Sequence, residues 1–133
     1  MSTAANYAST PKCGIGQIST ANTNRDGTGT IGTIFTAGAS GSRIDAINIK
    51  ATGTTTAGMI RLFIHDGTNA RLLTELPVLA LTPSATLPSW ETQLNTNTMT
   101  QVLPLVLPTG YSLRAATNNA ETFNVIALGG DFC

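Results

Sequence analysis

Short stretches of alternating apolar and polar residues, separated by turn-forming residues, run through nearly the whole of this 133-residue chain. No segment keeps the apolar spacing of an amphipathic helix over several turns. Instead, segments rich in Thr, Val, Ile and Leu recur, and Gly, Asn, Asp or Pro interrupts them about every 8–12 residues. This pattern predicts short β-strands joined by turns. The expected strands are residues 14–20, 30–37, 43–52, 59–66, 70–78, 101–107, 111–117 and 122–128.

About eight short strands in one domain of this length predict an all-β fold, either a β-sandwich or a barrel. We expect the antiparallel β-sandwich, of jelly-roll type. Residues 1–12 are polar and are expected to form an extended N-terminal arm, which leaves residues 13–133 as a single domain. Residues 79–100 break the alternation and are expected to be the long crossover between the two halves of a jelly roll. Residues 90–94 could form either a short helix or a short strand, and the sequence does not decide between them. Pro104 has no N–H to donate to a neighbouring strand, so we expect the strand over 101–107 at a sheet edge or at a bulge.

Alternation also predicts which side chains face the core, because successive side chains of a strand point to opposite faces. In the strand over 43–52, Ile47, Ile49 and Ala51 share one face, opposite Asn48 and Lys50. The strands over 59–66 and 70–78 are expected to form a β-hairpin through the turn at 66–69. Its expected apolar face comprises Ile60, Leu62, Ile64, Leu72, Leu76 and Val78. Its other face is mixed and carries Met59, Arg61, Phe63, His65, Arg71 and Glu75, with Arg61 and Glu75 able to pair across the strands.

The chain carries few charges. Seven Lys and Arg balance seven Asp and Glu, and charged residues make up 11%, against about 25% in an average soluble domain. No cluster of Lys and Arg is present to neutralise phosphates, so we expect no direct contact with nucleic acid. A surface without net charge repels its own copies weakly, which favours assembly. The chain shows neither a secretory signal pattern nor a membrane-length apolar run, so we expect assembly in the cytoplasm without membrane contact.

The two cysteines, Cys13 and Cys133, lie near opposite ends of the chain. Two reduced thiols are the expectation for a cytoplasmic protein. The alternative is a disulfide that ties the first strand to the tail or joins neighbouring copies. A structural zinc site needs four ligands, and His65 is the only histidine, so we expect no metal.

Catalytic motifs are scarce. The string at 27–32 (GTGTIG) matches G-x-G-x-x-G, but no helix is expected after it, so we do not interpret it as a dinucleotide site. His65 has no nucleophile motif beside it, and Trp90, the only tryptophan, is expected in the core or at an interface. We therefore expect no enzymatic activity and no cofactor. The candidate protein-contact residues are Tyr7, Met59, Phe63, His65, Trp90 and Phe132.

Residues 105–115 (LVLPTGYSLRA) and 119–132 (NAETFNVIALGGDF) resemble a family of small virion proteins encoded by tailed bacteriophages. Residues 53–67 (GTTTAGMIRLFIHDG) resemble the same family, and the similarity extends over about residues 36–132. Small jelly-roll cement, or decoration, proteins of phage heads have this size and architecture. The resemblance implies a structural virion protein without catalytic residues.

These observations favour a capsid decoration protein that assembles as a homodimer or homotrimer and binds the major capsid protein on the outer surface of the virion. The mixed face of Met59, Phe63 and His65, and the loop over 83–94 around Trp90, are the expected contact surfaces. The alternative is a fibre, spike or carbohydrate-binding β-sandwich module that recognises a host surface glycan. A third hypothesis, a glycan hydrolase, needs two carboxylates on opposite sides of a sugar bond.

Overall fold

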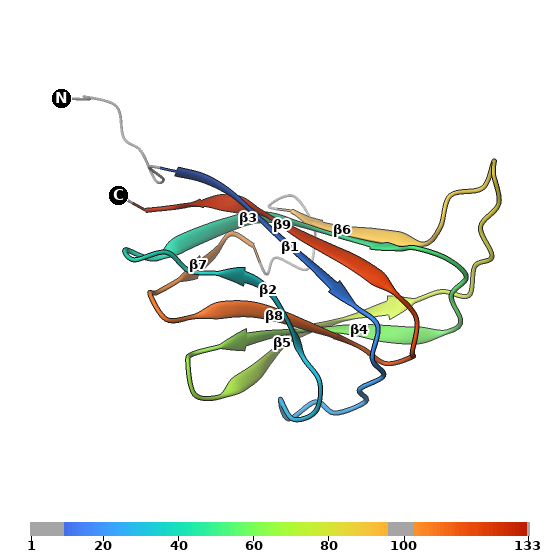
Figure 1. Cartoon of the computed structure of the whole chain (residues 1–133), viewed down its shortest axis with the longest axis horizontal. Helices are drawn as coiled ribbons and strands as arrows, with labels where there is room; N and C mark the ends of the chain where they lie inside the picture. The colour runs from blue at the N-terminus through green and yellow to red at the C-terminus, as the bar shows by residue number, and fades with distance from the viewer. Residues whose placement is uncertain (1–9, 96–102, 133) are drawn as a thin grey trace.

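The computed structural model describes residues 10–95 and 103–132, and every regular element in these ranges is a β-strand (Figure 1). The all-β prediction is therefore confirmed, with one strand more than the eight expected. The strands are β1 (Thr10–Ile18), β2 (Gly32–Thr36), β3 (Ser42–Ala51), β4 (Gly58–His65), β5 (Ala70–Val78), β6 (Glu91–Asn95), β7 (Leu105–Leu107), β8 (Ser112–Thr117) and β9 (Phe123–Asp131).

The strands form two layers, which Figure 1 shows one above the other. The first sheet has the order β1-β9-β3-β6, with β7 also paired with β3, and the second has the order β2-β8-β4-β5. All pairs of named strands are antiparallel. The chain passes from sheet to sheet between β1, β2, β3 and β4, and with β7 left aside the two four-stranded sheets have the strand order of a jelly roll. Within the described ranges there is no helix of the length and apolarity that a membrane span requires.

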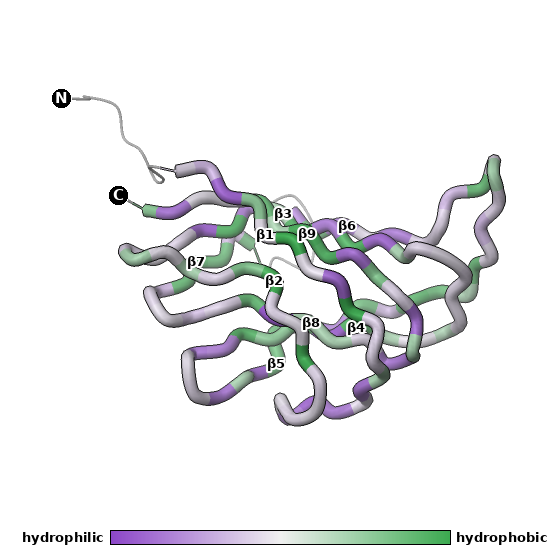
Figure 2. The backbone as a smooth tube through the Cα atoms, in the orientation of Figure 1, coloured by the Kyte–Doolittle hydropathy of each residue, from purple (hydrophilic) through white to green (hydrophobic). Residues whose placement is uncertain are grey.

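The hydrophobic core lies between the two sheets. The alternation predicted for 43–52 is confirmed, because Ile47, Ile49 and Ala51 are buried. Trp90 packs edge-on against Phe123 with ring centroids 5.8 Å apart, a favoured aromatic geometry. Figure 2 shows apolar residues interspersed with polar ones along the strands of both layers. The largest fully buried core side chains include Phe35, Ile44, Ile47, Ile49, Ile60, Leu62, Leu107, Leu113, Phe123 and Val125.

The structure corrects one segment boundary, resolves one open alternative and gives the position of the strand after Pro104. β1 begins at Thr10, which pairs with Asp131, so residues 10–12 belong to the first sheet and not to the arm. Residues 1–9 lie outside the described ranges. The open question at 90–94 is answered by β6, which pairs with β3. β7 follows Pro104 and pairs with β3 alone among the described strands, the edge position that this proline predicts.

The β4–β5 hairpin is confirmed, but one of its core residues was assigned to the wrong face. Asp66 Oδ1 accepts hydrogen bonds from the backbone N–H groups of Thr68 and Asn69, and Gly67 adopts a positive φ of 96° in the turn. A bulge then shifts the register, so that Leu62 pairs with Thr74 and Phe63 with Leu72. Leu73 therefore packs against the core, and Leu72, 36% exposed, faces outward.

A close approach between β1 and β2 holds the two sheets together at one edge. Gly14 and Gly16 point toward β2, and a Cβ atom on Gly14 would lie 2.4 Å from the carbonyl oxygen of Ile34. Only glycine fits such a distance. The inward positions of β1 are Gly14, Gly16 and the core residue Ile18, and the alternation places Ile15 on the outer face.

Candidate functional site

The outer face of the first sheet carries a band of side chains without charge. The registers of β1, β9, β3 and β6 place the outward residues in three rows. These rows are Cys13–Leu128–Ala46–Asn95, Ile15–Ile126–Asn48–Gln93 and Gln17–Asn124–Lys50–Glu91. We call the first two rows, together with Gln17 and Asn124, the uncharged band.

The uncharged band exposes apolar side chains. Ile15 is 71% exposed and Leu128 is 47% exposed, and the half-buried Ile126 lies beside Ile15 in the second row. Charges occur at the two ends of the band, where they pair with each other and not with the band itself. The flanking ion pairs are Arg43–Asp45 (2.8 Å) and Lys50–Glu91 (3.7 Å). Exposed apolar side chains grouped among uncharged polar ones are compatible with a protein-contact site.

A shallow depression of about 170 Å³ lies within the band, between β3, β6 and β9. Asn48, Gln93 and Asn95 border it on one side and Leu128 on the other. The Oδ1 atom of Asn48 is covered, and it accepts no hydrogen bond from the residues that the structure describes. An unpaired buried acceptor of this kind costs free energy.

The outer face of the second sheet is different, because the loop between β1 and β2 (residues 19–31, the β1–β2 loop) covers part of it. Arg61 lies on this face but is only 4% exposed, and it donates to Asn22 O, Asn118 Oδ1 and Glu75 Oε2. Arg25 of the loop donates to the same Glu75 oxygen at 2.7 Å. The hydrogen bond from Arg25, followed by that from Arg61, holds the pKa of Glu75 below its ordinary value. The predicted Arg61–Glu75 pair is thus confirmed.

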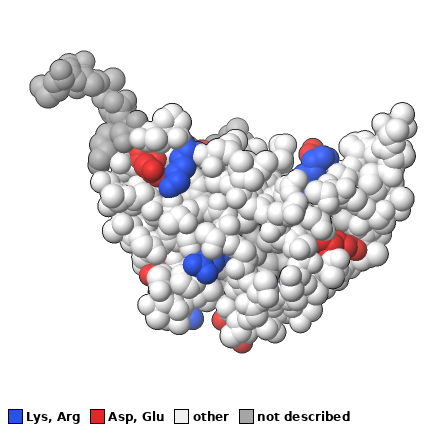
Figure 3. Space-filling view, in the orientation of Figure 1, with Lys and Arg blue, Asp and Glu red and all other residues white. Residues whose placement is uncertain are grey.

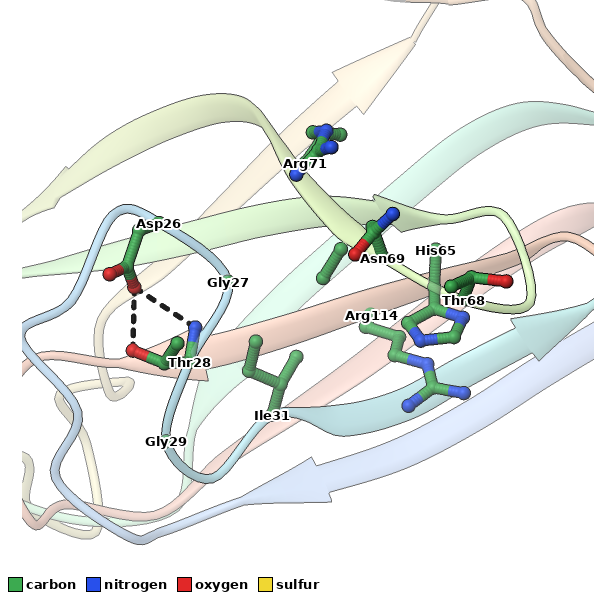
Figure 4. A pocket seen from close by; sticks show the side chains of 11 residues that line it. Asp26, Gly27, Thr28, Gly29, Ile31, His65, Thr68, Asn69, Arg71 and Arg114 are labelled. Carbon is green, nitrogen blue, oxygen red and sulfur yellow. Dashed lines mark hydrogen bonds between the residues drawn. The ribbon is translucent and has the colours of Figure 1, made fainter.

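A polar cleft of about 330 Å³ opens where the β1–β2 loop meets the β4–β5 hairpin (Figure 4). It is lined by residues 26–29 and Ile31 of the loop, by His65 and residues 68–71 of the hairpin, and by Arg114 of β8. The loop wall is ordered by Asp26, whose Oδ1 accepts from the hydroxyl and the N–H of Thr28. These bonds hold the pKa of Asp26 below its ordinary value, so this wall carries one negative charge at neutral pH.

His65 and Arg114 form the floor of the cleft, where Figure 4 shows the imidazole beside the guanidinium. They lie diagonally across the β4–β8 pairing, in which Phe63 is opposite Arg114 and His65 is opposite Ser112. His65 Nδ1 accepts a hydrogen bond from the backbone N–H of Gly67 at 3.0 Å. A neutral imidazole that accepts at Nδ1 carries its proton on Nε2, so His65 can donate from that atom.

The structure does not bring the predicted contact residues together. Phe63 has no solvent exposure, so the expectation that it contacts a partner is wrong. Trp90, 7% exposed, belongs to the core, which corrects its assignment to a contact surface in the 83–94 loop and confirms the core alternative. Met59, His65 and Phe132 are each half-buried and lie on different parts of the molecule, at the start of β4, at its end and after β9. Tyr7 lies outside the described ranges.

Sequence reasoning missed the residues that the structure makes accessible. Ile15 and Leu128 were assigned to strands but not to a surface, and Arg71 and Arg114 were not considered as binding residues. The glycines on both sides of Ile15 were the available signal, because they leave no inward apolar side chain in that part of β1. The string at 27–32 lines the cleft through Gly27, Gly29 and Ile31, and the strand β2 follows it, so the rejection of a dinucleotide fingerprint is supported.

Neither a metal centre nor a disulfide can be built from the described residues. No three His, Cys, Asp or Glu side chains gather within the ranges 10–95 and 103–132. Cys13 is exposed on the outer face of β1, and Cys133 lies outside the described ranges, so both predictions for the cysteines stay predictions.

No protein-family model matches this chain, and a search of characterised proteins finds no significant relative. Functional inference therefore depends on the residues and surfaces described above.

Proposed function

We propose that this protein is a structural virion protein that binds the outer surface of a phage capsid and stabilises contacts between major capsid subunits. The observation that carries the proposal is the uncharged band. Burial of the exposed Ile15 and Leu128 side chains favours association by the hydrophobic effect. The band itself contains no charged group, so no charge has to lose its hydration on contact. The resemblance of residues 36–132 to phage virion proteins gives the partner class.

The sparse charge of the whole surface supports the same proposal. In the view of Figure 3 the few charged side chains are separated by wide uncharged areas. Of the seven basic residues, five form ion pairs with acidic residues, which reduces the field that repels neighbouring copies. In this proposal copies associate as dimers or trimers, and several modest contacts then act together to give high avidity on the shell.

The proposal is tested by cryo-electron microscopy of purified virions and by the variant Ile15→Asp. Thr33→Asp on β2 is the matched control, because Thr33 is also an exposed strand residue and loses the same β-propensity. We expect stoichiometric density on the head, loss of head binding for Ile15→Asp, and normal binding for Thr33→Asp. Both variants should keep a melting temperature within about 2 °C of the parent, since surface substitutions change stability by about 0.5 kcal/mol. Density at the tail tip, absence from the particle, or normal head binding of Ile15→Asp would refute the proposal.

A second candidate function, a module that recognises a host surface glycan, is favoured by the polar cleft between the β1–β2 loop and the β4–β5 hairpin. Its volume of about 330 Å³ lies at the small end of ligand pockets, which span about 300–1,000 Å³. A glycan array tests this function. A specific and saturable ligand supports it, and the absence of any specific signal contradicts it.

A further inference from the structure

The polar cleft contains two arginines, Arg71 and Arg114, that form no ion pair with a carboxylate of residues 10–95 or 103–132. The other five basic residues, at positions 12, 25, 43, 50 and 61, each lie within 4.0 Å of an acidic oxygen. Within the described part of the chain, Arg71 and Arg114 form no such pair, and both line the cleft. Positive charge without an internal partner is thus concentrated at this one site.

Arg114 is held in place but keeps most of its donors. Its Nε–H donates to Ser112 Oγ at 3.0 Å, and the guanidinium lies in the floor of the cleft beside His65. The terminal nitrogens donate to no described residue. A guanidinium anchored through Nε presents its remaining N–H groups in a fixed plane, which suits the two oxygens of a carboxylate.

The charge of the lining favours a ligand with a single negative charge. Arg71 and Arg114 contribute two positive charges, and Asp26 contributes one negative charge. Asp66 stands next to the lining in the hairpin turn, where its Oδ1 is bound by the N–H groups of Thr68 and Asn69. A dianion would therefore meet two carboxylates with little surplus positive charge, whereas a monoanion is balanced by Arg114.

The remaining lining suits a ligand rich in hydroxyl groups. Thr68 and Asn69 contribute a hydroxyl and an amide group that both donate and accept, and Asp26 contributes acceptors. Gly27 and Gly29 adopt positive φ angles of 88° and 85° and pack closely against Ala70 and Asn22, which shapes the loop wall of the cleft. The size of the cleft corresponds to one small ligand and not to an extended chain.

We propose that this cleft binds one acidic monosaccharide unit, with Arg114 contacting its carboxylate and the hairpin and loop contacting its hydroxyl groups. The inference rests on the second candidate function, glycan recognition, and specifies its substrate class as uronic or sialic acids. It is independent of the uncharged band, which lies on the outer face of the other sheet.

The test is a titration of the full chain with D-glucuronic acid and with N-acetylneuraminic acid. Binding is measured by isothermal titration calorimetry or by the NMR shifts of the cleft amides. The methyl ester of each sugar acid is the control ligand, because it removes the charge and keeps the ring. We expect a Kd on the order of 1 mM for at least one acid, and a loss of about tenfold or more for its ester. Arg114→Gln should cause the same loss, which is the effect of removing one charge-assisted hydrogen-bonded pair.

Arg43→Gln is the matched control variant, since Arg43 is also a half-buried strand arginine but lies on the first sheet, and its affinity should stay within about twofold of the parent. Arg71→Gln, on an exposed position, provides a second cleft variant that does not depend on the folding of Arg114→Gln. Equal affinity for acid and ester, or binding that neither cleft variant lowers, would overturn the acidic-sugar inference and leave glycan recognition standing. No binding of any acidic or neutral monosaccharide, together with a silent glycan array, would overturn both.

Discussion

Gly14→Ala is the substitution that most directly tests how the two sheets are joined. A Cβ atom at this position would lie 2.4 Å from Ile34 O and 2.9 Å from Phe35 Cβ. The first of these atoms belongs to the backbone of β2, so a rotamer change cannot relieve the clash and the strands must separate. Overpacking of this kind costs about 1–3 kcal/mol, and the loss of glycine entropy from the unfolded chain returns about 0.4–1 kcal/mol. Because the 2.4 Å contact is with a backbone atom, the upper end of the overpacking range applies, and we expect a net destabilisation of about 2 kcal/mol.

Urea denaturation and thermal melting measure this effect. With a urea slope of about 2 kcal/mol/M, the midpoint should fall by about 1 M. At roughly 4 °C for each kcal/mol, the melting temperature should fall by about 8 °C. Gly53→Ala is the matched control, because a Cβ atom there meets nothing within 4 Å and the same entropy term stabilises the protein by about 0.4–1 kcal/mol.

The neighbouring residue supplies the converse test. Ile15→Thr should change the free energy of unfolding by no more than about 0.5 kcal/mol, since the side chain is 71% exposed and Thr keeps the β-branched shape. If Gly14→Ala were neutral and Ile15→Thr were strongly destabilising, the face assignment of β1 would be reversed. That result would also remove the exposed apolar residue on which the uncharged band depends.

Three further predictions concern the core, the bulge and the pH dependence. Trp90→Ala should lower the free energy of unfolding by about 3–5 kcal/mol, and the parent should show blue-shifted tryptophan fluorescence that moves red on unfolding, because Trp90 is 7% exposed. Leu73→Ala should lower the urea midpoint more than Leu72→Ala, because the bulge turns Leu73 toward the core, and equal shifts would argue against the bulge. The Ser42 hydroxyl and then the Lys12 ammonium hold the pKa of Asp131 below its ordinary value, so this carboxylate stabilises the fold above a pH of about 4 and loses that effect as the pH falls. Asp131→Asn should therefore flatten the acid side of a plot of melting temperature against pH, and an unchanged plot would contradict the contribution of this group.

The strands and most of their faces were predictable because the signal is local. Successive side chains of a strand point to opposite faces, so the residues of the covered face are buried. Ile49 and Val125, which have no solvent exposure, are examples. The hairpin at 66–69 was predictable from its turn residues, since Asp66 and Gly67 form the turn through their own backbone. Cross-strand pairing of Arg61 with Glu75 then follows from the hairpin.

Other features were not predictable, because they depend on segments that are distant in the chain. The bulge that exchanges Leu72 with Leu73 is a register choice between β4 and β5, and the composition of 70–78 does not reveal it. Phe63 reads as a residue of a mixed surface, yet it is fully buried on a face of the second sheet where the β1–β2 loop covers Arg61. The cleft joins residues 26 and 114, whose proximity no local pattern encodes.

The class of the fold, an antiparallel β-sandwich with few surface charges, was readable from the sequence, because alternation is a property of neighbouring residues and charge content is a property of composition. What that surface offers to other molecules depends on how the strands pair. The pairing of β1, β9, β3 and β6 gathers single uncharged residues into one band, and the approach of a loop to a hairpin brings two arginines to one cleft, where no described carboxylate pairs with them. The physical reason is that a surface is defined by which strands are adjacent, and adjacency in a jelly roll is set by long-range pairing and not by position in the chain.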